Sequence, residues 1–413
     1  MRSLFSSRER RLYLGGQTVS LLGDRVLFLA MGIWTKTLTG SNGAAGLTFF
    51  FFVAPSLLAP LAGALVDRLP RRTFLILVNL ATGLVVCSLV LVNGRGQVWL
   101  IYLVMFLYGA SATVLSAGGS AMLTMLFASD ELGSANAYLS TVGEGCRLFA
   151  PLAGAGLFVV IGGAALGLID AATFFIAAAS LAAISVKEAA AAGASSPWRS
   201  YVAAGVRHLV QNAPLRQMTA AVALAMLFAG LLESIGFAVV SQGLHRAPPF
   251  LGVLISAQGV GALAGALTAA RIMRRIGAGG LIAAGLAVLA LGVFAWTASD
   301  LALVIPGFIL TGLGVPWLII GYVTAIQRLT PMALQGRVDA AASFLLGTPQ
   351  AVSIAAGAGL VTVVNYRILL AMSAAVFASA GLGLISRRQQ RHAFIEAAAV
   401  SVAAADPAGA SQD

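Results

Sequence analysis

The sequence Gly63-Ala-Leu-Val-Asp-Arg-Leu-Pro-Arg-Arg72 lies between two long apolar segments, one at 46–62 and one that begins at Thr73. Its second half packs one acid and three arginines into six residues. A connection this short places the ends of both flanking helices at the same face of a membrane, and an excess of arginine assigns that face to the cytoplasm. The stretch therefore predicts a cytoplasmic loop between two membrane-spanning helices.

The composition of the whole chain agrees with a membrane protein. Of its 413 residues, 59% are hydrophobic and 9% are charged, whereas a soluble domain carries about 25% charged residues. A spanning helix needs about 20 apolar residues, so twelve helices would use roughly 240 residues of the chain. The 47 glycines suit helices that approach one another closely. We therefore expect an all-α membrane protein with twelve transmembrane helices.

Long apolar runs divide the sequence into the expected spans. These are 12–37, 43–66, 73–92, 98–127, 134–160, 164–186, 216–243, 250–272, 280–298, 301–327, 338–364 and 368–386. Pro55 and Pro60 are expected to kink the second span, because proline removes a backbone donor and crowds the preceding turn. The long connection at 187–215 follows the sixth span, and within it 198–210 is predicted to form an amphipathic helix on the cytoplasmic surface.

An internal repeat indicates that the chain arose by duplication. The sequence Leu-Ala-Gly-Ala-Leu at 61–65 recurs at 263–267, and an Arg-Arg pair follows each copy. Both copies fall at the end of the second span of a half, which predicts two six-helix bundles related by a pseudo-two-fold axis. The expected parts are an N-terminal bundle at 1–186, a cytoplasmic linker at 187–215, a C-terminal bundle at 216–388 and a partly disordered cytoplasmic tail at 389–413.

The net charge of +11 is interpreted through the placement of the basic residues. With these spans, most of the 25 Lys and Arg fall in cytoplasmic segments beside anionic lipid. We therefore expect a multi-pass protein of the inner (plasma) membrane with both termini cytoplasmic, and no binding of nucleic acid. Cys87 and Cys146 both lie in apolar spans, so neither a disulfide framework nor a metal site is predicted. The basic residues expected on the outer side are Lys36, Arg95, Arg246 and Arg367.

Several ionisable residues fall inside the expected spans. A charge at the centre of a lone helix costs about 2.5–3.5 kcal/mol on insertion scales, so each one must face a cavity or a partner. Glu144 and Arg147 are three residues apart on one helical face and can pair. Either they form a neutralised structural pair, or Arg147 holds Glu144 ionised and its departure lets Glu144 take up a proton. The full set is Asp24, Arg25, Glu144, Arg147, Asp170 and Glu233.

The remaining acids differ in how isolated they are. Asp24 lies midway along the first span, and the adjacent Arg25 points to another face of the helix. Asp24 could contact Arg147 or a substrate, or it could pair structurally. Glu233 has no cation one turn away and is the best candidate for protonation, with a hydrogen bond to a neighbouring helix as the alternative. Asp170 lies near the outer end of its span, where a structural role is favoured.

The loop at 63–72 resembles the signature loop of the major facilitator superfamily, which reads roughly Gly-x-Leu-Ala-Asp-Arg-x-Gly-Arg-Arg. Val66 stands where alanine is usual in this loop, and Pro70 stands where glycine is usual. The resemblance implies two six-helix bundles around a central cavity. It also implies a latch, formed by Asp67 and the arginines of the loop, that closes the cytoplasmic side in the outward-facing state. The residues that fall on the pattern are Gly63, Leu65, Asp67, Arg68, Arg71 and Arg72.

Shorter motifs resemble the branch of drug:proton antiporters that includes macrolide and enterobactin exporters. Pro151 and Gly154 resemble the proline motif on the fifth helix of exporters, although Ala150 replaces its usual glycine. The arginine that many drug antiporters carry on the fourth helix is missing, and Arg147 could do its work. The other motifs are Gly16-Gln17 with 20–24, 134–137, 169–171 with Phe174-Phe175, 327–331 and 336–338.

The same resemblance implies a cavity lined mainly by the first, fourth, seventh and tenth helices. Side chains on these helices could form an apolar pocket with a few polar tips. For the aromatic ones, the alternative is packing between helices or anchoring at the membrane interface. The candidate cavity residues are Gln17, Phe28, Tyr108, Phe237, Trp317 and Tyr322. The candidates for proton coupling are Asp24, Glu144, Arg147 and Glu233.

The leading functional hypothesis is secondary active transport, with a lipophilic or amphiphilic molecule such as a drug, macrolide or siderophore exported in exchange for protons. The alternative is an importer or facilitator of a small polar metabolite, which would favour a cavity richer in Asn, Gln and charged residues. An enzyme is not expected, because His208, His245 and His392 lie in loops or the tail and no nucleotide-binding or nucleophile motif occurs. No cofactor is expected. The expected partners are the substrate, protons and lipid, and the expected state is a monomer.

Overall fold

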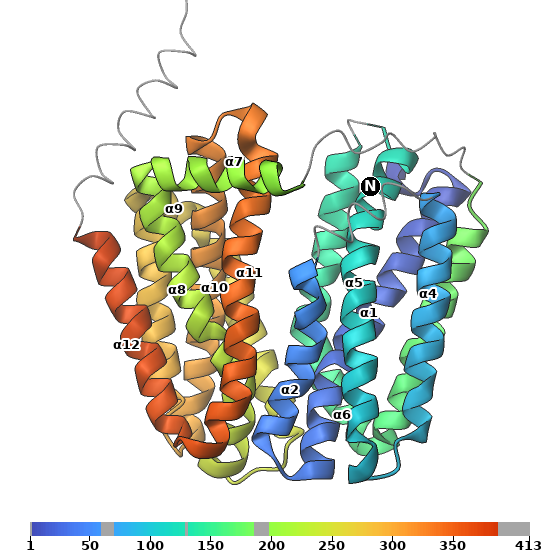
Figure 1. The fold of residues 1–413 in the computed structure, drawn as a ribbon, viewed down its shortest axis with the longest axis horizontal. Helices are drawn as coiled ribbons and strands as arrows, with labels where there is room; N and C mark the ends of the chain where they lie inside the picture. Colours follow the sequence, from blue (N-terminus) through green and yellow to red (C-terminus); the bar gives the residue numbers. More distant parts are fainter. Residues whose placement is uncertain (1, 59–69, 129–130, 186–197, 387–413) are drawn as a thin grey trace, which may run out of the picture.

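The computed structural model describes residues 2–58, 70–128, 131–185 and 198–386, and within these residues it contains helices and no strand. The helices form two upright groups that stand side by side (Figure 1). The N-terminal half contains α1 (Arg8–Thr39), α2 (Asn42–Val53), α4 (Arg71–Cys87), α5 (Val98–Leu126) and α6 (Leu132–Ala182). The C-terminal half contains α8 (Ala213–Ala238), α9 (Phe250–Ala295), α10 (Leu301–Leu329), α11 (Met332–Val363) and α12 (Tyr366–Ile385).

Short irregular helices extend or connect these elements. Four are 3-10 helices, which are common at helix ends and in connections. A single π-helical segment continues α8. The 3-10 helices are η1 (Arg2–Phe5), η2 (Ala54–Leu58), η3 (Ser88–Leu91) and η4 (Arg95–Gln97), and the π-helical segment is Val239–Gly243.

Two of the helices each consist of two legs. At 1.5 Å per residue the 51 residues of α6 would extend about 76 Å, far beyond the roughly 30 Å hydrocarbon layer of a bilayer. The backbone leaves the helical conformation at Gly162 in α6 and at Gly277 in α9, where φ is 78° and 75°. Positive φ values are accessible to glycine because it has no Cβ. The chain reverses at both positions, close to the breaks that the sequence predicts.

The second apolar segment, predicted as a helix over 43–66 with kinks at Pro55 and Pro60, is described as far as Leu58. The α-helix ends at Val53, and η2, which contains Pro55, follows it as a 3-10 helix. Proline cannot donate the next helical hydrogen bond, which explains the change in winding at this point. Residues 59–69, with Pro60, Gly63, Asp67 and Arg68, lie outside the described residues.

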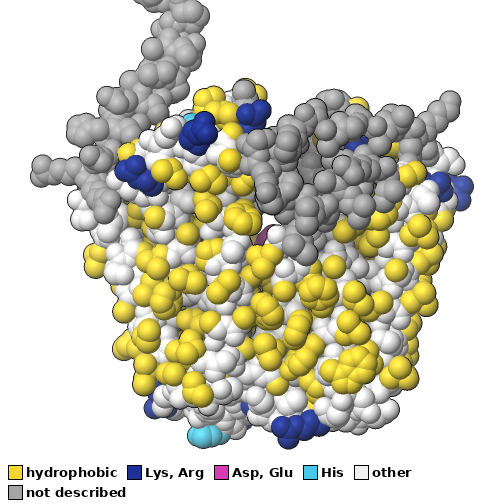
Figure 2. Space-filling view, in the orientation of Figure 1, with side chains coloured by type: hydrophobic (Ala, Val, Ile, Leu, Met, Phe, Trp, Pro, Cys, Tyr) yellow, Lys and Arg dark blue, Asp and Glu magenta, His cyan; other side chains and the backbone are white. Residues whose placement is uncertain are grey.

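The described helices have the length and composition of membrane spans. Nine of them are long and apolar enough to cross a bilayer, and Asn42–Leu57 forms a shorter apolar helix. On the face drawn in Figure 2, hydrophobic side chains cover the flanks, and Lys and Arg side chains gather at the two ends. A belt of this kind matches the hydrocarbon layer between two charged interfaces.

Helix α7 (Trp198–Gln211) lies across one end of the C-terminal half, here called the α7 face (Figure 1). The amphipathic helix predicted at 198–210 is therefore present. It packs closely on α11, because a Cβ on Gly205 would overlap the Arg337 carbonyl. The ring nitrogen Nε2 of His208 also lies 3.3 Å from the Leu329 carbonyl at the end of α10.

The two halves approach each other most closely away from the α7 face (Figure 1). One contact, here called the α2 seam, joins α2 to α8 and α11. A Cβ on Gly43 would overlap the Ala358 carbonyl of α11, and a Cβ on Gly46 would overlap the Ser234 Oγ of α8. The absence of side chains on these glycines is therefore what allows the helices to touch.

A second contact, here called the α6 seam, joins the first leg of α6 to the first leg of α9. A Cβ on Gly252 would lie 2.5 Å from the Ala155 Cβ and 2.7 Å from the Pro151 carbonyl oxygen. A Cβ on Gly259 would lie 3.0 Å from the Leu148 side chain. The two seams thus rest on small residues, and both border the cavity described next.

Candidate functional site

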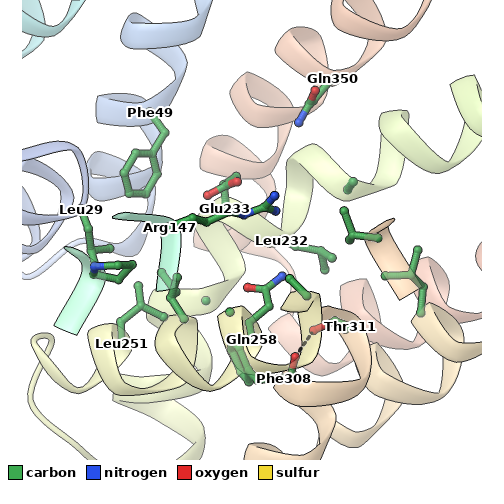
Figure 3. A pocket seen from close by; sticks show the side chains of 18 of the residues that line it. Leu29, Phe49, Arg147, Leu232, Glu233, Leu251, Gln258, Phe308, Thr311 and Gln350 are labelled. Carbon is green, nitrogen blue, oxygen red and sulfur yellow. Dashed lines mark hydrogen bonds between the residues drawn. The ribbon is translucent and has the colours of Figure 1, made fainter. Parts of the chain in front are cut away.

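A cavity of about 480 Å³ lies between the two halves, and both halves line it (Figure 3). The N-terminal half supplies residues from α1, α2 and α6. The C-terminal half supplies residues from all five of its long helices. The lining side chains used below are Arg25, Phe28, Phe49, Glu144, Arg147, Pro151, Glu233, Gln258, Trp296, Phe308, Thr311, Gln350 and Phe377.

Four of the lining residues are charged. Arg25, Glu144 and Arg147 come from the N-terminal half, and Glu233 comes from the C-terminal half. The Arg147 Nη1 atom lies 4.0 Å from Glu144 Oε2, and both side chains are well exposed to the cavity, at 42% and 69%. Arg147 is also close enough to Glu233 to interact with it electrostatically (Figure 3). We call Arg25, Glu144, Arg147 and Glu233 the cavity cluster.

The spacing of residues on α6 explains the shape of this corner. Glu144, Arg147 and Pro151 follow one another at intervals of three and four residues, so they share one helical face. Gly154, one turn further, packs on α1, because a Cβ there would overlap the Val26 carbonyl. The Pro151 carbonyl meets Gly252 of α9 in the α6 seam. The proline motif therefore lies where α1, α6 and α9 come together.

Aromatic rings form much of the apolar wall. In the C-terminal half, Trp296 and Phe308 stack with their ring centroids 3.8 Å apart and their planes 8° from parallel. In the N-terminal half, Phe28 packs on Phe49 with centroids 4.8 Å apart. Such rings offer large apolar contact areas with defined geometry. The wall can thus hold a flat or bulky apolar group on either side.

A few polar groups interrupt this wall. The Nε1 atom of Trp296 is buried and has no hydrogen-bond partner among the described residues. Gln258 and Gln350 also line the cavity, and the described part of the chain offers their side-chain amides no hydrogen bond. The Thr311 hydroxyl, in contrast, donates to the Phe308 carbonyl at 2.8 Å (Figure 3). The two amides are therefore available to a ligand, whereas the indole N–H is unpartnered but buried.

The candidate residues from the sequence are divided between the cavity and its surroundings. Phe28, Glu144, Arg147, Pro151 and Glu233 line the cavity. The candidates that are not among its lining residues are Gln17, Asp24, Tyr108, Gly154, Phe237, Trp317 and Tyr322.

Three of these aromatic candidates have other contacts. Phe237 stacks behind Phe49, with ring centroids 6.0 Å apart. The Trp317 indole donates to the Gly265 carbonyl and to Thr268 Oγ1, both at 3.0 Å. These contacts fit the alternative of packing between helices. Tyr322 shows the same pattern, since its hydroxyl lies 2.8 Å from Thr219 Oγ1.

Asp24 lies on the other side of α1 from the cavity, inside the N-terminal half. The Tyr108 hydroxyl of α5 donates to Asp24 Oδ1 at 2.6 Å. Asp170 of α6 is near enough to interact electrostatically with both residues. Asp24 therefore accepts a hydrogen bond from Tyr108 and lies near Asp170. The sequence had instead suggested a contact with Arg147 or with a substrate.

The basic loop of the opening sequence is described only at its end. Pro70 precedes α4, and Arg71 and Arg72 form its first residues. Arg72 donates from Nε to the Leu181 carbonyl at 2.9 Å and from Nη2 to the Ala182 carbonyl at 2.6 Å. These are among the last carbonyls of α6, which have no partner within their own helix. Arg72 thus ties the start of α4 to the end of α6.

Several cavity residues were not singled out from the sequence. Gln258 is a polar residue in an apolar run, and its spacing from Leu251 and Ile255 matches one helical face. That spacing could have identified it. Trp296 and Phe308 gave no comparable signal, because an aromatic residue in a membrane span is more often a packing residue.

The sequence profile of the Major Facilitator Superfamily matches residues 13–244. This match covers more than half of the chain, and the chain belongs to this superfamily. It is accordingly a multi-pass membrane transport protein. No curated protein matches the sequence.

Solved structures share the fold at low sequence identity. An inward-facing bacterial homologue of the iron transporter ferroportin superposes with a TM-score of 0.71 and 17% identity, covering 93% of this chain and 100% of its own. The nucleoside transporter NupG gives 0.74 and 12%, covering 92% and 99%. The POT family transporter PepTSo gives 0.69 and 12%, covering 90% and 97%. The transporters named here differ in cargo, so the shared fold leaves the substrate open.

Proposed function

We propose that the protein is a secondary transporter that exports amphiphilic small molecules in exchange for protons, as in the drug:proton antiporter branch. The observation that carries this proposal is the cavity between the halves, which combines an aromatic wall with the cavity cluster. An apolar body can lie on the Trp296–Phe308 stack while a polar or charged end meets Arg25, Glu144 or Arg147. Burial of the apolar body supplies affinity, and the few polar groups supply orientation.

We propose that the α7 face is cytoplasmic. Arg71, Arg72 and the Arg274-Arg275 pair lie at the helix ends on this side, which agrees with the positive-inside rule. Counting the two legs of α6 and of α9 separately, and α2 with its continuation as one span, gives the twelve spans predicted from the sequence. Both termini are then cytoplasmic. The predicted boundaries at 186, 215 and 388 remain part of this proposal.

The contacts between the halves support an inward-facing state. Both seams lie away from the α7 face. The halves converge at the end of the molecule that contains the seams (Figure 1). Alternating access would part these seams and close the halves near the α7 face. The latch predicted at Gly63, Asp67 and Arg68 belongs to that closed state and is part of the same proposal.

Arg147 is the residue best placed to couple protons to this movement. It lies near Glu144 on its own helix and near Glu233 on the other half. When the halves rotate against each other, its distance to Glu233 changes while its distance to Glu144 on the same helix is retained. A carboxylate that loses its cation in a poorly solvated site favours the protonated form. Glu233 therefore takes up a proton when Arg147 moves away and releases it on return.

A polar metabolite is the second candidate, favoured by the unpartnered amides of Gln258 and Gln350 and the unpartnered indole N–H of Trp296. A small polar substrate would satisfy these groups without using the aromatic wall. The two candidates differ in what competes for the cavity. Lipophilic cations would displace an amphiphilic substrate but leave a small polar metabolite bound.

The test uses purified protein in liposomes with an imposed pH gradient. Internal pH is followed while lipophilic cations, macrolide-like compounds, siderophores, nucleosides and dipeptides are added in turn. Proton movement that depends on an amphiphilic compound is the expected result. Glu233→Gln should abolish it, while Asp339→Asn, which changes an exposed acid on α11, serves as the matched control. Substrate equilibration without proton movement would refute the antiporter and indicate a facilitator.

A further inference from the structure

Two carboxylates meet inside the N-terminal half, away from the cavity. Asp24 of α1 is partly exposed, and Asp170 in the second leg of α6 is 2% exposed. We call Asp24 and Asp170 the acid pair. The backbone of α1 lies directly against it, because a Cβ on Gly23 would overlap Asp170 Oδ1 and would lie 2.7 Å from Thr173 Oγ1. A glycine at position 23 is therefore what gives Asp170 its place beside α1.

The hydrogen bonds around the acid pair are too few for two ionised carboxylates. The Tyr108 hydroxyl has a single proton, and it donates this proton to Asp24 Oδ1 at 2.6 Å. The Thr173 hydroxyl donates to the backbone carbonyl of Asp170 at 2.7 Å and lies 3.5 Å from Asp170 Oδ1. Asp170 Oδ2 is buried and has no hydrogen-bond partner among the described residues. An ionised Asp170 would therefore be a buried, poorly solvated charge beside a second carboxylate.

Compensating cations around the acid pair are equally few. Within the described residues, the charged or titratable groups that act on it are Arg25 on α1 and Tyr108 on α5. Arg25 follows Asp24 in sequence but lines the cavity on another side of the helix. Two carboxylates that share a site cannot both ionise without strong repulsion. One proton on the pair removes that repulsion, and Asp170 Oδ2, which accepts no hydrogen bond from the described residues, is the position left to carry it.

We propose that Asp24 and Asp170 bind one exchangeable proton, which Asp170 Oδ2 holds in the conformation seen here. The proton enters from water by way of the partly exposed Asp24 carboxylate and leaves by the same route. An O–H bond forms at one carboxylate as the other gives up its proton, and no bond between heavy atoms changes. The acid pair is thus a proton site distinct from the cavity cluster.

Helix α1 connects this proton site to the substrate cavity. Asp24 and Arg25 are adjacent residues that face opposite regions, so a rotation of α1 moves both at once. A movement that draws Arg25 toward a bound substrate changes the contact between Asp24 and Asp170. The role in coupling rests on the proposed function, whereas the presence of a proton on the acid pair does not.

Infrared spectroscopy of the full-length protein in liposomes tests the proton directly, because a protonated carboxyl group has a carbonyl band that a carboxylate lacks. We expect a band that titrates with pH in the unmodified protein, that disappears in Asp170→Asn and that persists in Asp339→Asn. An unchanged titrating band in Asp170→Asn would overturn the proposal. Asp24→Asn provides a second test, because it removes the repulsion that keeps Asp170 protonated, so the carboxyl band should disappear at a lower pH than in the unmodified protein.

A metal cation is the competing occupant of paired carboxylates. Calcium takes six to eight oxygen ligands, and the acid pair with Tyr108 and Thr173 offers few free ones. Titrating Ca²⁺, Mn²⁺ or Na⁺ at constant pH decides between them. No change in the carboxyl band supports the proton site. Loss of the band on addition of one of these ions would overturn it.

Transport measurements separate this proposal from the proposed function. In liposomes, Asp170→Asn should reduce uphill transport driven by a pH gradient by at least about tenfold and leave substrate counterflow unchanged. Equal losses in both measurements, or no loss in either, would remove the acid pair from coupling. If the unmodified protein shows no proton-driven transport, the proposed function fails, and the infrared titration alone then supports or overturns the proton site.

Discussion

The cavity cluster and the acid pair lie on opposite sides of α1 and differ in how their charges are balanced. In the cavity cluster, two arginines accompany two glutamates, and Arg147 and Glu144 are both well exposed to the cavity. In the acid pair, two carboxylates interact electrostatically, a single tyrosine donates to one of them, and Asp170 is almost fully buried. Solvated charges can be neutralised by neighbours that move, whereas a buried pair without a cation needs a proton.

This difference assigns separate tasks to the two sites. The cavity cluster is open to the substrate, so its charges can respond to what is bound. In our proposal the acid pair, which lies behind α1 with Asp24 partly exposed, responds to pH and to movement of that helix. Changes at the cavity cluster should therefore alter substrate binding and proton coupling together. Changes at the acid pair should alter proton coupling and leave substrate counterflow unchanged.

Loss of the Arg147 charge should have the largest effect. Arg147→Gln leaves Glu144 and Glu233 without their shared cation, and proton-driven transport should fall by at least about tenfold, equivalent to about 1.4 kcal/mol. Arg147→Lys keeps the charge and should retain a substantial part of the activity. Transport in liposomes measures both. Full activity in Arg147→Gln, or an altered carboxyl band of the acid pair in this variant, would contradict the separation of the two sites.

Removal of the tyrosine donor should have the next largest effect. Tyr108→Phe deletes a hydrogen bond to a charged acceptor, which contributes about 1.5–3 kcal/mol, so the variant should unfold at a lower temperature and show a changed pH profile of transport. Tyr102→Phe is the matched control, because its hydroxyl donates to the neutral Ala44 carbonyl at 3.1 Å. Thermal unfolding in detergent and transport across a pH range compare them. Identical pH profiles for the two variants would remove Tyr108 from the proton site.

A change in the aromatic wall should affect substrates more than protons. Trp296→Phe removes the unpartnered indole N–H but keeps a ring against Phe308. One neutral hydrogen bond contributes about 0.5–1.5 kcal/mol, so substrates that carry an acceptor should bind roughly two- to tenfold more weakly. Purely lipophilic cations should be unaffected. Binding assays with both classes measure this, and an equal loss for both would indicate a packing role for Trp296.

The smallest effect is expected at Thr173. Thr173→Val keeps the shape of the side chain and removes a hydroxyl that is bonded to a backbone carbonyl at 2.7 Å. The change in unfolding free energy should be about 1 kcal/mol or less. The carboxyl band of Asp170 should stay and shift slightly, because its weak contact at 3.5 Å is lost. Disappearance of the band would mean that Thr173, and not the Asp24 carboxylate, determines the protonation of Asp170.

Much of the helical arrangement could be predicted from the sequence. The apolar runs gave most helices within a few residues, and the glycines at 162 and 277–280 coincided with expected turns. In the second span, the kink predicted at Pro55 coincides with the change from α-helical to 3-10 winding after Val53. Glu144 and Arg147 were expected to share one helical face, and their charged groups lie 4.0 Å apart, because spacing on one helix determines which residues share a face.

Contacts between helices were harder to predict. Asp24 and Asp170 are far apart in sequence, and no feature of either span indicates that α1 and the second leg of α6 are neighbours at this depth. The decisive residue is Gly23, whose role is visible only once Asp170 lies against it. Arg25 was predicted to face away from Asp24, and this was confirmed, but its position in the cavity depends on the C-terminal half.

The glycine seams have a consequence for how this protein tolerates substitution. At Gly43 and Gly252 the contact involves backbone atoms and no glycine side chain, so closing the seam at these positions costs little side-chain entropy. The same positions accept no larger residue while the halves are in contact. An added methyl group would act as a wedge and favour the opposite state of the transport cycle. Random mutation at these glycines should therefore yield proteins locked in one conformation, not unfolded ones.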